Sequence, residues 1–219
     1  MKTKLLLLFA FTLILATGVK AQDQTVQVGE TKNYSAQGTT TGNTFLWTVT
    51  NANGASITSP SAASTAIKWL KPGMYTLTFK ETNPRSTSCY VEKTKTIKVT
   101  GNTLAMGTPP SSTCAPTSGS TPVQFVVNRA GGVNAVTVNY SYKINNGTAT
   151  TGSVSIAASA GSANIDLSIP NPTDGSTDNV VDLTITSATD ADGNTITVTG
   201  LTQQVTLFAT PITTDITFN

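Results

Sequence analysis

Residues 125–156 form the segment that most restricts the fold of this chain. Apolar and polar residues alternate almost without interruption in FVVNRAGGVNAVTVNYSYKINNGTATTGSVSI, and Asn146-Gly147 breaks the alternation. Alternation places successive side chains on opposite faces of a β-strand, and Asn-Gly is the strongest short signal for a hairpin turn. The segment therefore predicts a β-hairpin with one buried face that turns at Asn146-Gly147.

The same alternation recurs along most of the chain. It is found in residues 45–49, 67–69, 75–79, 97–99, 165–169, 181–185 and 196–198. Short strands at about ten-residue spacing, separated by turn residues, favour antiparallel sandwiches. We predict an all-β fold of two antiparallel, immunoglobulin-like β-sandwich domains in tandem, with Trp47 as a core anchor of the first.

Lys93 and Lys95 interrupt the apolar pattern of the first domain. They share the parity of Ile97 and Val99, which places them on the inner face of the same strand unless a bulge intervenes. Charges that point inward protect the edge of a sheet from pairing with other chains. We therefore expect an edge strand here.

The N-terminal residues have the pattern of a secretory signal peptide. Lys2 and Lys4 precede the apolar run 5–16, and Val19-Lys20-Ala21 is a suitable cleavage site before Gln22. The run of about 12 residues is shorter than the roughly 20 that span a bilayer. We predict a signal peptide at 1–21 and a mature chain that is not inserted in the membrane. Its expected location is extracellular, on the cell surface or in the periplasm.

A Pro/Ser/Thr-rich stretch divides the mature chain. Residues 102–122 contain four prolines, which predicts a stiff linker between domains at 22–101 and 123–219. Residues 22–101 carry eight Lys and Arg and four Asp and Glu, whereas residues 102–219 carry two and seven. These opposite charges either attract one domain, or one molecule head to tail, to the next, or they are solvated side chains that cluster without function.

Sequence motifs in each domain resemble a known family. The first domain resembles the PKD-like modules of bacterial surface proteins over residues 24–100, in VGETKNYS, FLWTVTNANGAS, TAIKWL, PGMYTLTFKET and CYVEKTKTIKVT. The second resembles Calx-β domains over 123–210, in VVNRAGG, VTVNYSY, NGTATTG and ANIDLSIP. Both resemblances imply β-sandwich modules of cell-surface proteins, and some Calx-β domains bind calcium through acidic loops.

The composition argues against an enzyme. The chain has no histidine, which excludes Ser-His-Asp and Cys-His catalysis and the common zinc sites. Its acidic residues match no glycosidase motif, and no phosphate-binding glycine loop is present. The lysines of residues 93–98 lack the interleaved aromatics of a single-strand nucleic-acid binder. We predict no catalytic residues, no nucleic-acid partner and no bound cofactor, with calcium as the one candidate ligand.

Two groups of residues are candidates for a metal site and a disulfide. The oxygen-bearing side chains that could bind calcium lie in two loops: Asp174, Asp178, Asp190, Asp192 and Asn194. The same residue types are also common in plain turns. Cys89 and Cys114 form a disulfide in an oxidising compartment, or Cys89 is a buried free thiol and Cys114 is unpaired. Both pairs of alternatives stay open at this point.

These observations predict a structural, adhesive or protein-interaction subunit of a bacterial envelope or surface assembly. Its partners would be envelope or surface proteins, or further copies of the chain. The alternative is an accessory module that binds calcium or a polysaccharide.

Overall fold

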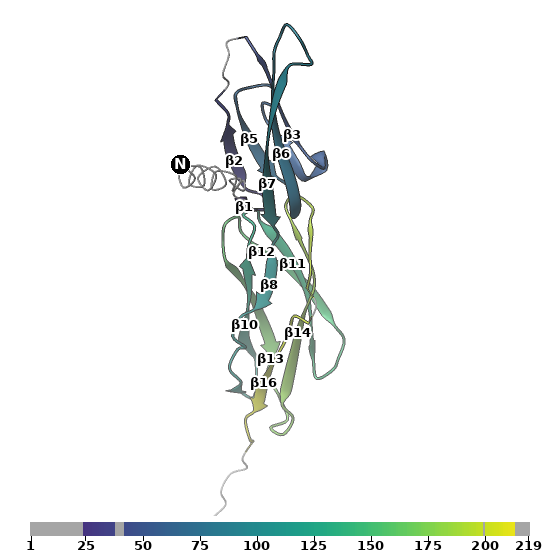
Figure 1. The fold of residues 1–219 in the computed structure, drawn as a ribbon. Helices are drawn as coiled ribbons and strands as arrows, with labels where there is room; N and C mark the ends of the chain where they lie inside the picture. The colour runs from purple at the N-terminus through teal and green to yellow at the C-terminus, as the bar shows by residue number, and fades with distance from the viewer. Residues whose placement is uncertain (1–23, 38–41, 199, 213–219) are drawn as a thin grey trace, which may run out of the picture.

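The computed structural model describes residues 24–37, 42–198 and 200–212. Two β-sandwiches stack end to end and give an elongated molecule, which confirms the predicted all-β class (Figure 1). Helical structure in these ranges is limited to one short 3-10 turn, Ala52–Gly54, and no helix there is long and apolar enough to span a bilayer. The predicted signal peptide lies outside the described residues.

The first sandwich packs a four-stranded sheet against a three-stranded one. Its strands are β1 (Gln24–Gln27), β2 (Thr31–Ser35), β3 (Thr44–Val49), β4 (Ala55–Ile57), β5 (Ser64–Trp69), β6 (Gly73–Thr82) and β7 (Tyr90–Thr100). The order is β1-β7-β6-β3 in the larger sheet and β2-β5-β4 in the smaller. Alternate residues of β5, β6 and the second half of β7 are buried, as the period of two requires.

Aromatic side chains fill the centre of this sandwich. Trp69 is fully buried and Trp47 nearly so, which confirms Trp47 as a core residue. Trp47 packs on Phe79 with ring centroids 4.8 Å apart, and Trp69 packs on Tyr75 at 5.4 Å. Large aromatic rings bury much apolar area for few residues, which suits a domain of this small size.

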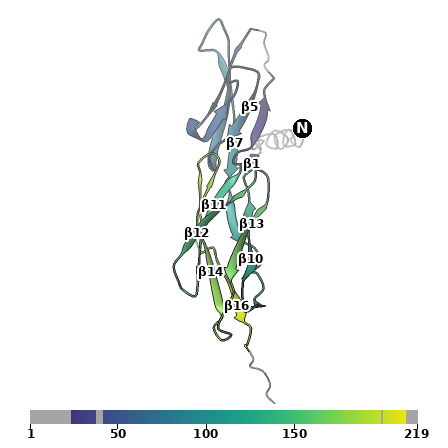
Figure 2. The ribbon, with the colours of Figure 1, turned by 180° about the vertical axis from the view of Figure 1, so that it is seen from behind.

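The second sandwich has a three-stranded and a six-stranded sheet (Figure 2). Its strands are β8 (Thr103–Met106), β9 (Thr113–Ala115), β10 (Ser120–Ala130), β11 (Val136–Ile144), β12 (Thr150–Ile156), β13 (Ser162–Pro170), β14 (Asn179–Asp190), β15 (Thr195–Ile196) and β16 (Thr202–Ala209). The orders are β13-β10-β8 and β12-β11-β14-β16-β9, with β15 beside β14. Phe125, Ile156, Ile165 and Leu183 lie fully buried between the sheets.

The hairpin predicted from residues 125–156 is present, with its turn one residue earlier than expected. β11 and β12 pair antiparallel, and Asn145 and Asn146 both have positive φ, at 51° and 58°. The Gly147 amide donates to the Ile144 carbonyl at 2.8 Å and closes the turn. Positive φ at both central residues defines the favoured hairpin turn, and asparagine adopts it more readily than most residues.

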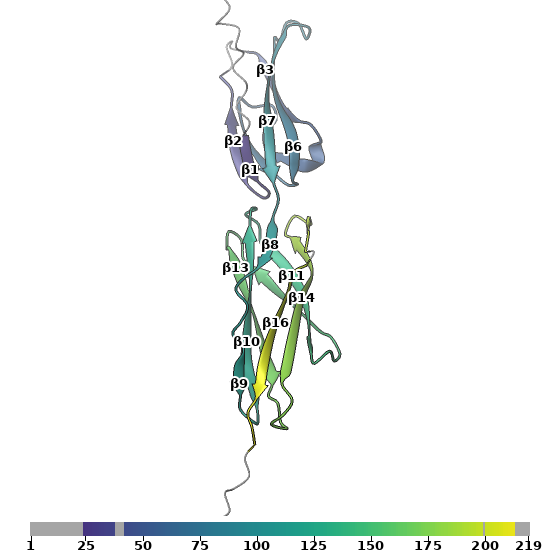
Figure 3. The same ribbon diagram turned by 60° about the horizontal axis from the view of Figure 1, so that its bottom comes forward.

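The predicted linker at 102–122 is not a linker in the structure. β8 pairs antiparallel with β10, and β9 pairs parallel with β16, so both strands belong to the second sandwich. The connection between the domains is Gly101-Asn102, between the end of β7 and the start of β8 (Figure 3). Both pairings join strands distant in sequence, which the local composition does not reveal.

Candidate functional site

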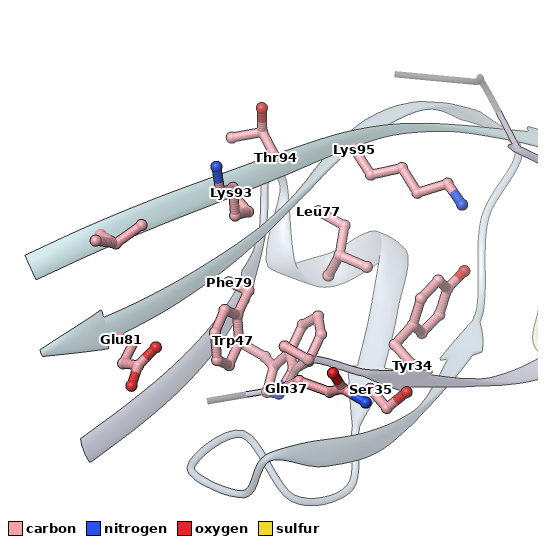
Figure 4. Close-up of a pocket in the computed structure, with 12 residues that line it drawn as sticks. Tyr34, Ser35, Gln37, Trp47, Leu77, Phe79, Glu81, Lys93, Thr94 and Lys95 are labelled. Carbon is pink, nitrogen blue, oxygen red and sulfur yellow. The ribbon is translucent and has the colours of Figure 1, made fainter. Parts of the chain in front are cut away.

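A groove opens between the two sheets of the first sandwich, at the end away from the second domain. It has a volume of about 450 Å³ and is bordered by the end of β2 and the first half of β7. Figure 4 shows Trp47, Leu77 and Phe79 on its floor, with Tyr34, Lys93 and Lys95 at its sides. The floor is apolar and the rim is polar and basic.

The first half of β7 is uncovered because β1, as described, begins opposite Ile97. β1 pairs with β7 over Ile97–Thr100, and the chain then continues as β2, which pairs with β5 of the other sheet. In the described ranges, the stretch Tyr90–Thr96 therefore has β6 as its one neighbouring strand. An edge of this kind presents backbone NH and CO groups without strand partners.

A hydrogen bond at Thr100, the last residue of β7, shows which way the backbone groups of the first half of β7 point. The Thr100 carbonyl accepts from the Val28 amide at 2.9 Å, on the side where β1 lies. Backbone groups alternate in direction along a strand, so those of Thr96, Thr94 and Glu92 point to the same side. Among the described residues, no strand lies on that side of β7 at these three residues.

Lys93 and Lys95 extend from the inner face of β7 into the groove. β7 pairs with β6 without a register shift, which places Lys93 opposite Phe79 and Lys95 opposite Leu77. This confirms the expected inward direction without a bulge. The predicted edge strand is confirmed only for Tyr90–Thr96, because from Ile97 onward β7 lies between β6 and β1. Within the described residues, neither ammonium group lies in an ion pair. The two positive charges therefore stand over an apolar floor and face the solvent at the groove.

The floor of the groove is held in place by hydrogen bonds and aromatic contacts. Trp47 Nε1 donates to the Ala62 carbonyl at 2.9 Å, and Phe45 stacks on Phe79 with ring centroids 5.6 Å apart. Glu81 is buried at the far end and accepts from Asn43 Nδ2 at 2.7 Å. Burial raises the pKa of the Tyr34 hydroxyl. These contacts preform the groove.

A second polar site lies where the two sandwiches meet. The Val133 amide donates to the Val28 carbonyl at 3.0 Å, and Asn194 Nδ2 donates to the Leu70 carbonyl at 2.7 Å. Lys68 forms an ion pair with Asp192, with Nζ and Oδ1 2.8 Å apart. All three contacts cross between domains, so the junction is fixed at several points around the two-residue connection.

Asp190 is the buried centre of this junction. One of its carboxylate oxygens accepts from the amides of Asp192 and Asn194, at 3.0 and 2.9 Å. The other accepts from the side chains of Asn194 and Asn102, at 2.9 and 3.4 Å. Asn134 Nδ2 donates to Asp192 beside them. The loop between β14 and β15 is thereby tied both to the connection and to the first sandwich.

The predicted calcium ligands divide between opposite ends of the second domain. Asp190, Asp192 and Asn194 lie at the junction, whereas Asp174 and Asp178 precede β14 and lie at the other end of that strand. Asp174 accepts from the Ser176 and Thr177 amides, and Asp178 accepts from the Ala209 amide. The described residues contain no group of three or more His, Cys, Asp or Glu side chains that could hold a metal.

The junction does not fit a calcium ion. Calcium takes six to eight oxygen ligands, but Asp190 and Asp192 are surrounded by NH groups and the Lys68 ammonium group. A cation would have to displace these donors and break the contacts between the domains. The described side chains have the hydrogen bonds of a turn, and the choice between a plain turn and a calcium site stays a prediction.

Cys89 and Cys114 are both free and exposed, which corrects the predicted disulfide between them. Cys89 precedes β7 at the outer end of the first sandwich, and Cys114 lies in β9, paired to the end of β16. A disulfide requires Cα atoms within about 7 Å. The two residues lie in different sandwiches, because the segment between them is part of the second sandwich and not a linker that folds back. Figure 3 shows β9 at the end of the second sandwich away from the first.

Comparisons with known proteins find distant structural similarity. No protein-family model matches the chain, and no curated protein matches its sequence. Among solved structures, the apo-form Calx CBD1 domain has a TM-score of 0.39 and 10% identity, covering 49% of this chain and 96% of that one. The PKD domain from KIAA 1837 protein has a TM-score of 0.29 and 14% identity, covering 39% and 92%. Sidekick-1 immunoglobulin domains 1-5 have a TM-score of 0.43 and 13% identity, covering 90% and 39%.

The similar structures include both kinds of module that the sequence resembles. Their TM-scores are below 0.5, so they assign no ligand and no activity to this chain. The fold class rests on the strand order itself.

Proposed function

We propose that this chain is an exported, non-enzymatic structural or protein-interaction subunit of a bacterial envelope or surface assembly. The main observation behind the proposal is the junction between the domains. Contacts across it hold the two small sandwiches in one stiff, elongated unit. A two-residue connection, an interdomain ion pair and two interdomain hydrogen bonds hold the domains end to end. A stiff rod holds binding surfaces at a fixed separation, which suits a subunit of an assembly.

The exposed surfaces support an interaction role. The apolar groove and the open edge of β7 lie at the outer end of the first domain, away from the junction. An open strand edge beside an apolar groove is an arrangement that binds an extended segment of another protein. The basic first domain and the acidic second domain would orient partners of opposite charge.

The location is tested by fractionation of cells that express the chain, followed by protease treatment of intact cells. We expect the chain in the envelope or outside the cell, with residues 1–21 removed, as mass spectrometry of the purified protein would show. A chain that stays in the cytoplasm with residues 1–21 attached would contradict the proposal.

The interaction role is tested by chemical crosslinking in intact cells, followed by purification. A stoichiometric protein crosslinked through residues of the groove or of β7 supports the proposal. Retention on purified envelope polysaccharide, without a protein partner, would support the alternative of a glycan-binding module.

A further inference from the structure

The open half of β7 has space and backbone groups for one more strand. Tyr90–Thr96 has no described neighbour on the side away from β6, and Thr96, Thr94 and Glu92 direct backbone groups there. Beside this edge lies the groove with its apolar floor and two lysines. An added strand would pair with β7 through its backbone and place alternate side chains in the groove.

The groove selects the chemistry of this strand. Trp47, Leu77 and Phe79 favour apolar side chains at every second position. Lys93 and Lys95 disfavour a basic residue at the positions that face the groove, because their charges lie on that face. The exposed Val91, with 57% of its surface accessible, extends the apolar border of the groove at the same edge.

The chain itself contains a segment with this pattern. Residues 212–219, ITTDITFN, alternate Ile212, Thr214, Ile216 and Phe218 with a second set of polar residues that includes Asp215. Isoleucine, threonine and phenylalanine are favoured in strands. The segment has one acidic residue and no basic residue. Ile212, the last residue that the structure describes, is 62% exposed at the far end of the second domain.

The segment cannot reach the groove of its own molecule. Residues 213–219 span at most about 25 Å when fully extended. The twelve residues of β14 alone separate this end of the second domain from the junction, a length of roughly 36–40 Å at the rise of a β-strand. The groove lies on the other side of the junction, beside the first half of β7. The partner must therefore be another copy.

We propose that residues 212–219 of one molecule add as a strand to the Tyr90–Thr96 edge of the next, with Ile216 and Phe218 in its groove. Asp215 then points away from the groove, to the face of the sheet that carries Thr94 and Thr96. Copies joined in this way form a head-to-tail chain in which each acidic second domain meets a basic first domain. This inference rests on the proposed interaction role and names the partner of the groove.

The first test is binding of a fluorescent peptide of residues 210–219 to the intact mature protein, measured by anisotropy. We expect saturable binding that weakens at high salt, because the charges contribute to it. A peptide with Phe218→Asp should bind at least about tenfold more weakly, a loss of about 1.4 kcal/mol.

The second test is the concentration dependence of sedimentation for the protein and three variants. The wild type should associate, and deletion of residues 213–219 should make it monomeric. Lys93→Glu with Lys95→Glu should weaken both self-association and peptide binding at least about tenfold, because it puts negative charge at the groove where an acidic segment binds. Lys98→Glu with Lys71→Glu changes the net charge equally at exposed positions outside the groove, and both properties should persist.

Melting curves of all variants identify any that fail to fold. If the variant with Lys93→Glu and Lys95→Glu fails to fold, Lys93→Gln with Lys95→Gln replaces it. A wild type that stays monomeric, fails to bind the peptide or associates without residues 213–219 would overturn the proposal. Such a result leaves the location and the crosslinked envelope partners untouched, so it is distinguishable from failure of the proposed function.

Discussion

At the scale of single residues, two glycines set how closely the sandwiches approach. Gly131 and Gly132 have positive φ, at 74° and 63°, and belong to the motif VVNRAGG. A Cβ atom on Gly131 would overlap the Gly101 carbonyl oxygen, and one on Gly132 would overlap the Asn102 side chain. The motif thus allows the loop between β10 and β11 to pack against the domain connection.

Gly131→Ala should lower the free energy of unfolding by about 1–3 kcal/mol, because a side chain at this φ is strained and lacks space. Gly161→Ala is a matched control, since a Cβ atom on Gly161 would meet no atom within 4 Å and its φ is not positive. The control should change stability by less than about 1 kcal/mol. Denaturant unfolding measures both, and equal effects would show that the junction does not constrain Gly131.

Asp174 should titrate far below an ordinary aspartate. Hydrogen bonds from Thr177 and from the Ser176 and Thr177 amides lower its pKa from 3.8 to about 2. Because the folded-state pKa is lowered, the carboxylate stabilises the fold above about pH 4, and this contribution is lost as pH falls through 2. NMR titration of the carboxyl carbon checks the value. Thr177→Ala should raise the pKa toward 3.8, and an unchanged midpoint would contradict this assignment of its cause.

At the scale of elements, the loop between β14 and β15 is either a plain turn or a calcium-binding loop. Its carboxylates accept hydrogen bonds from amides, asparagines and Lys68. We expect neither excess calcium nor a chelator to change the melting temperature, because a cation would compete with donors already in place. A rise in melting temperature with calcium, accompanied by heat of binding in calorimetry, would contradict this expectation.

Local sequence predicted the strands better than their partners. Alternation identified β10, β11, β13 and β14, because each buries one face and is long enough to show a period of two. β8 and β9 have four and three residues and lie in a proline-rich stretch, so they resembled a linker. Their identity as strands depends on pairing with β10 and β16, which lie far along the chain.

The candidate site was also predictable only in part, because local alternation shows where side chains point but not which strands pair. The parity of Lys93 and Lys95 correctly indicated charges that point inward, at the half of β7 that has one described neighbouring strand. The groove itself was not predicted, because it depends on two pairings distant in sequence: β1 covers only the second half of β7, and β2 pairs with β5 in the other sheet. The role of Asp192 at the junction depends on Lys68, which is 124 residues away, and no local spacing indicates that pair.

At the scale of the whole molecule, the junction should make the relative position of the domains uniform. Cys89 and Cys114 are exposed, one in each domain, and provide sites for spin labels. The wild type should give one narrow distance distribution between the labels. Lys68→Ala with Asp192→Ala should broaden it, while the free energy of unfolding changes by only about 0–1 kcal/mol, because the pair is partly exposed.

Lys80→Ala is the control for this measurement. It removes an ion pair with Glu92, at 3.8 Å, that lies within the first sandwich. The distance distribution should stay narrow in this variant. Equal broadening in both variants would show that the pair between Lys68 and Asp192 does not fix the junction.

The parallel pairing of β1 with β7 determines how the first sandwich responds to tension. Both strands run toward the junction, in register from Gln24 opposite Ile97 to Gln27 opposite Thr100. Force that pulls the upstream end of β1 away from the downstream end of β7 slides one strand along the other. In this shear geometry the hydrogen bonds between the strands bear the load together and rupture together. They do not open one after another. The first sandwich should therefore resist stretching along the rod more strongly than pulling across it.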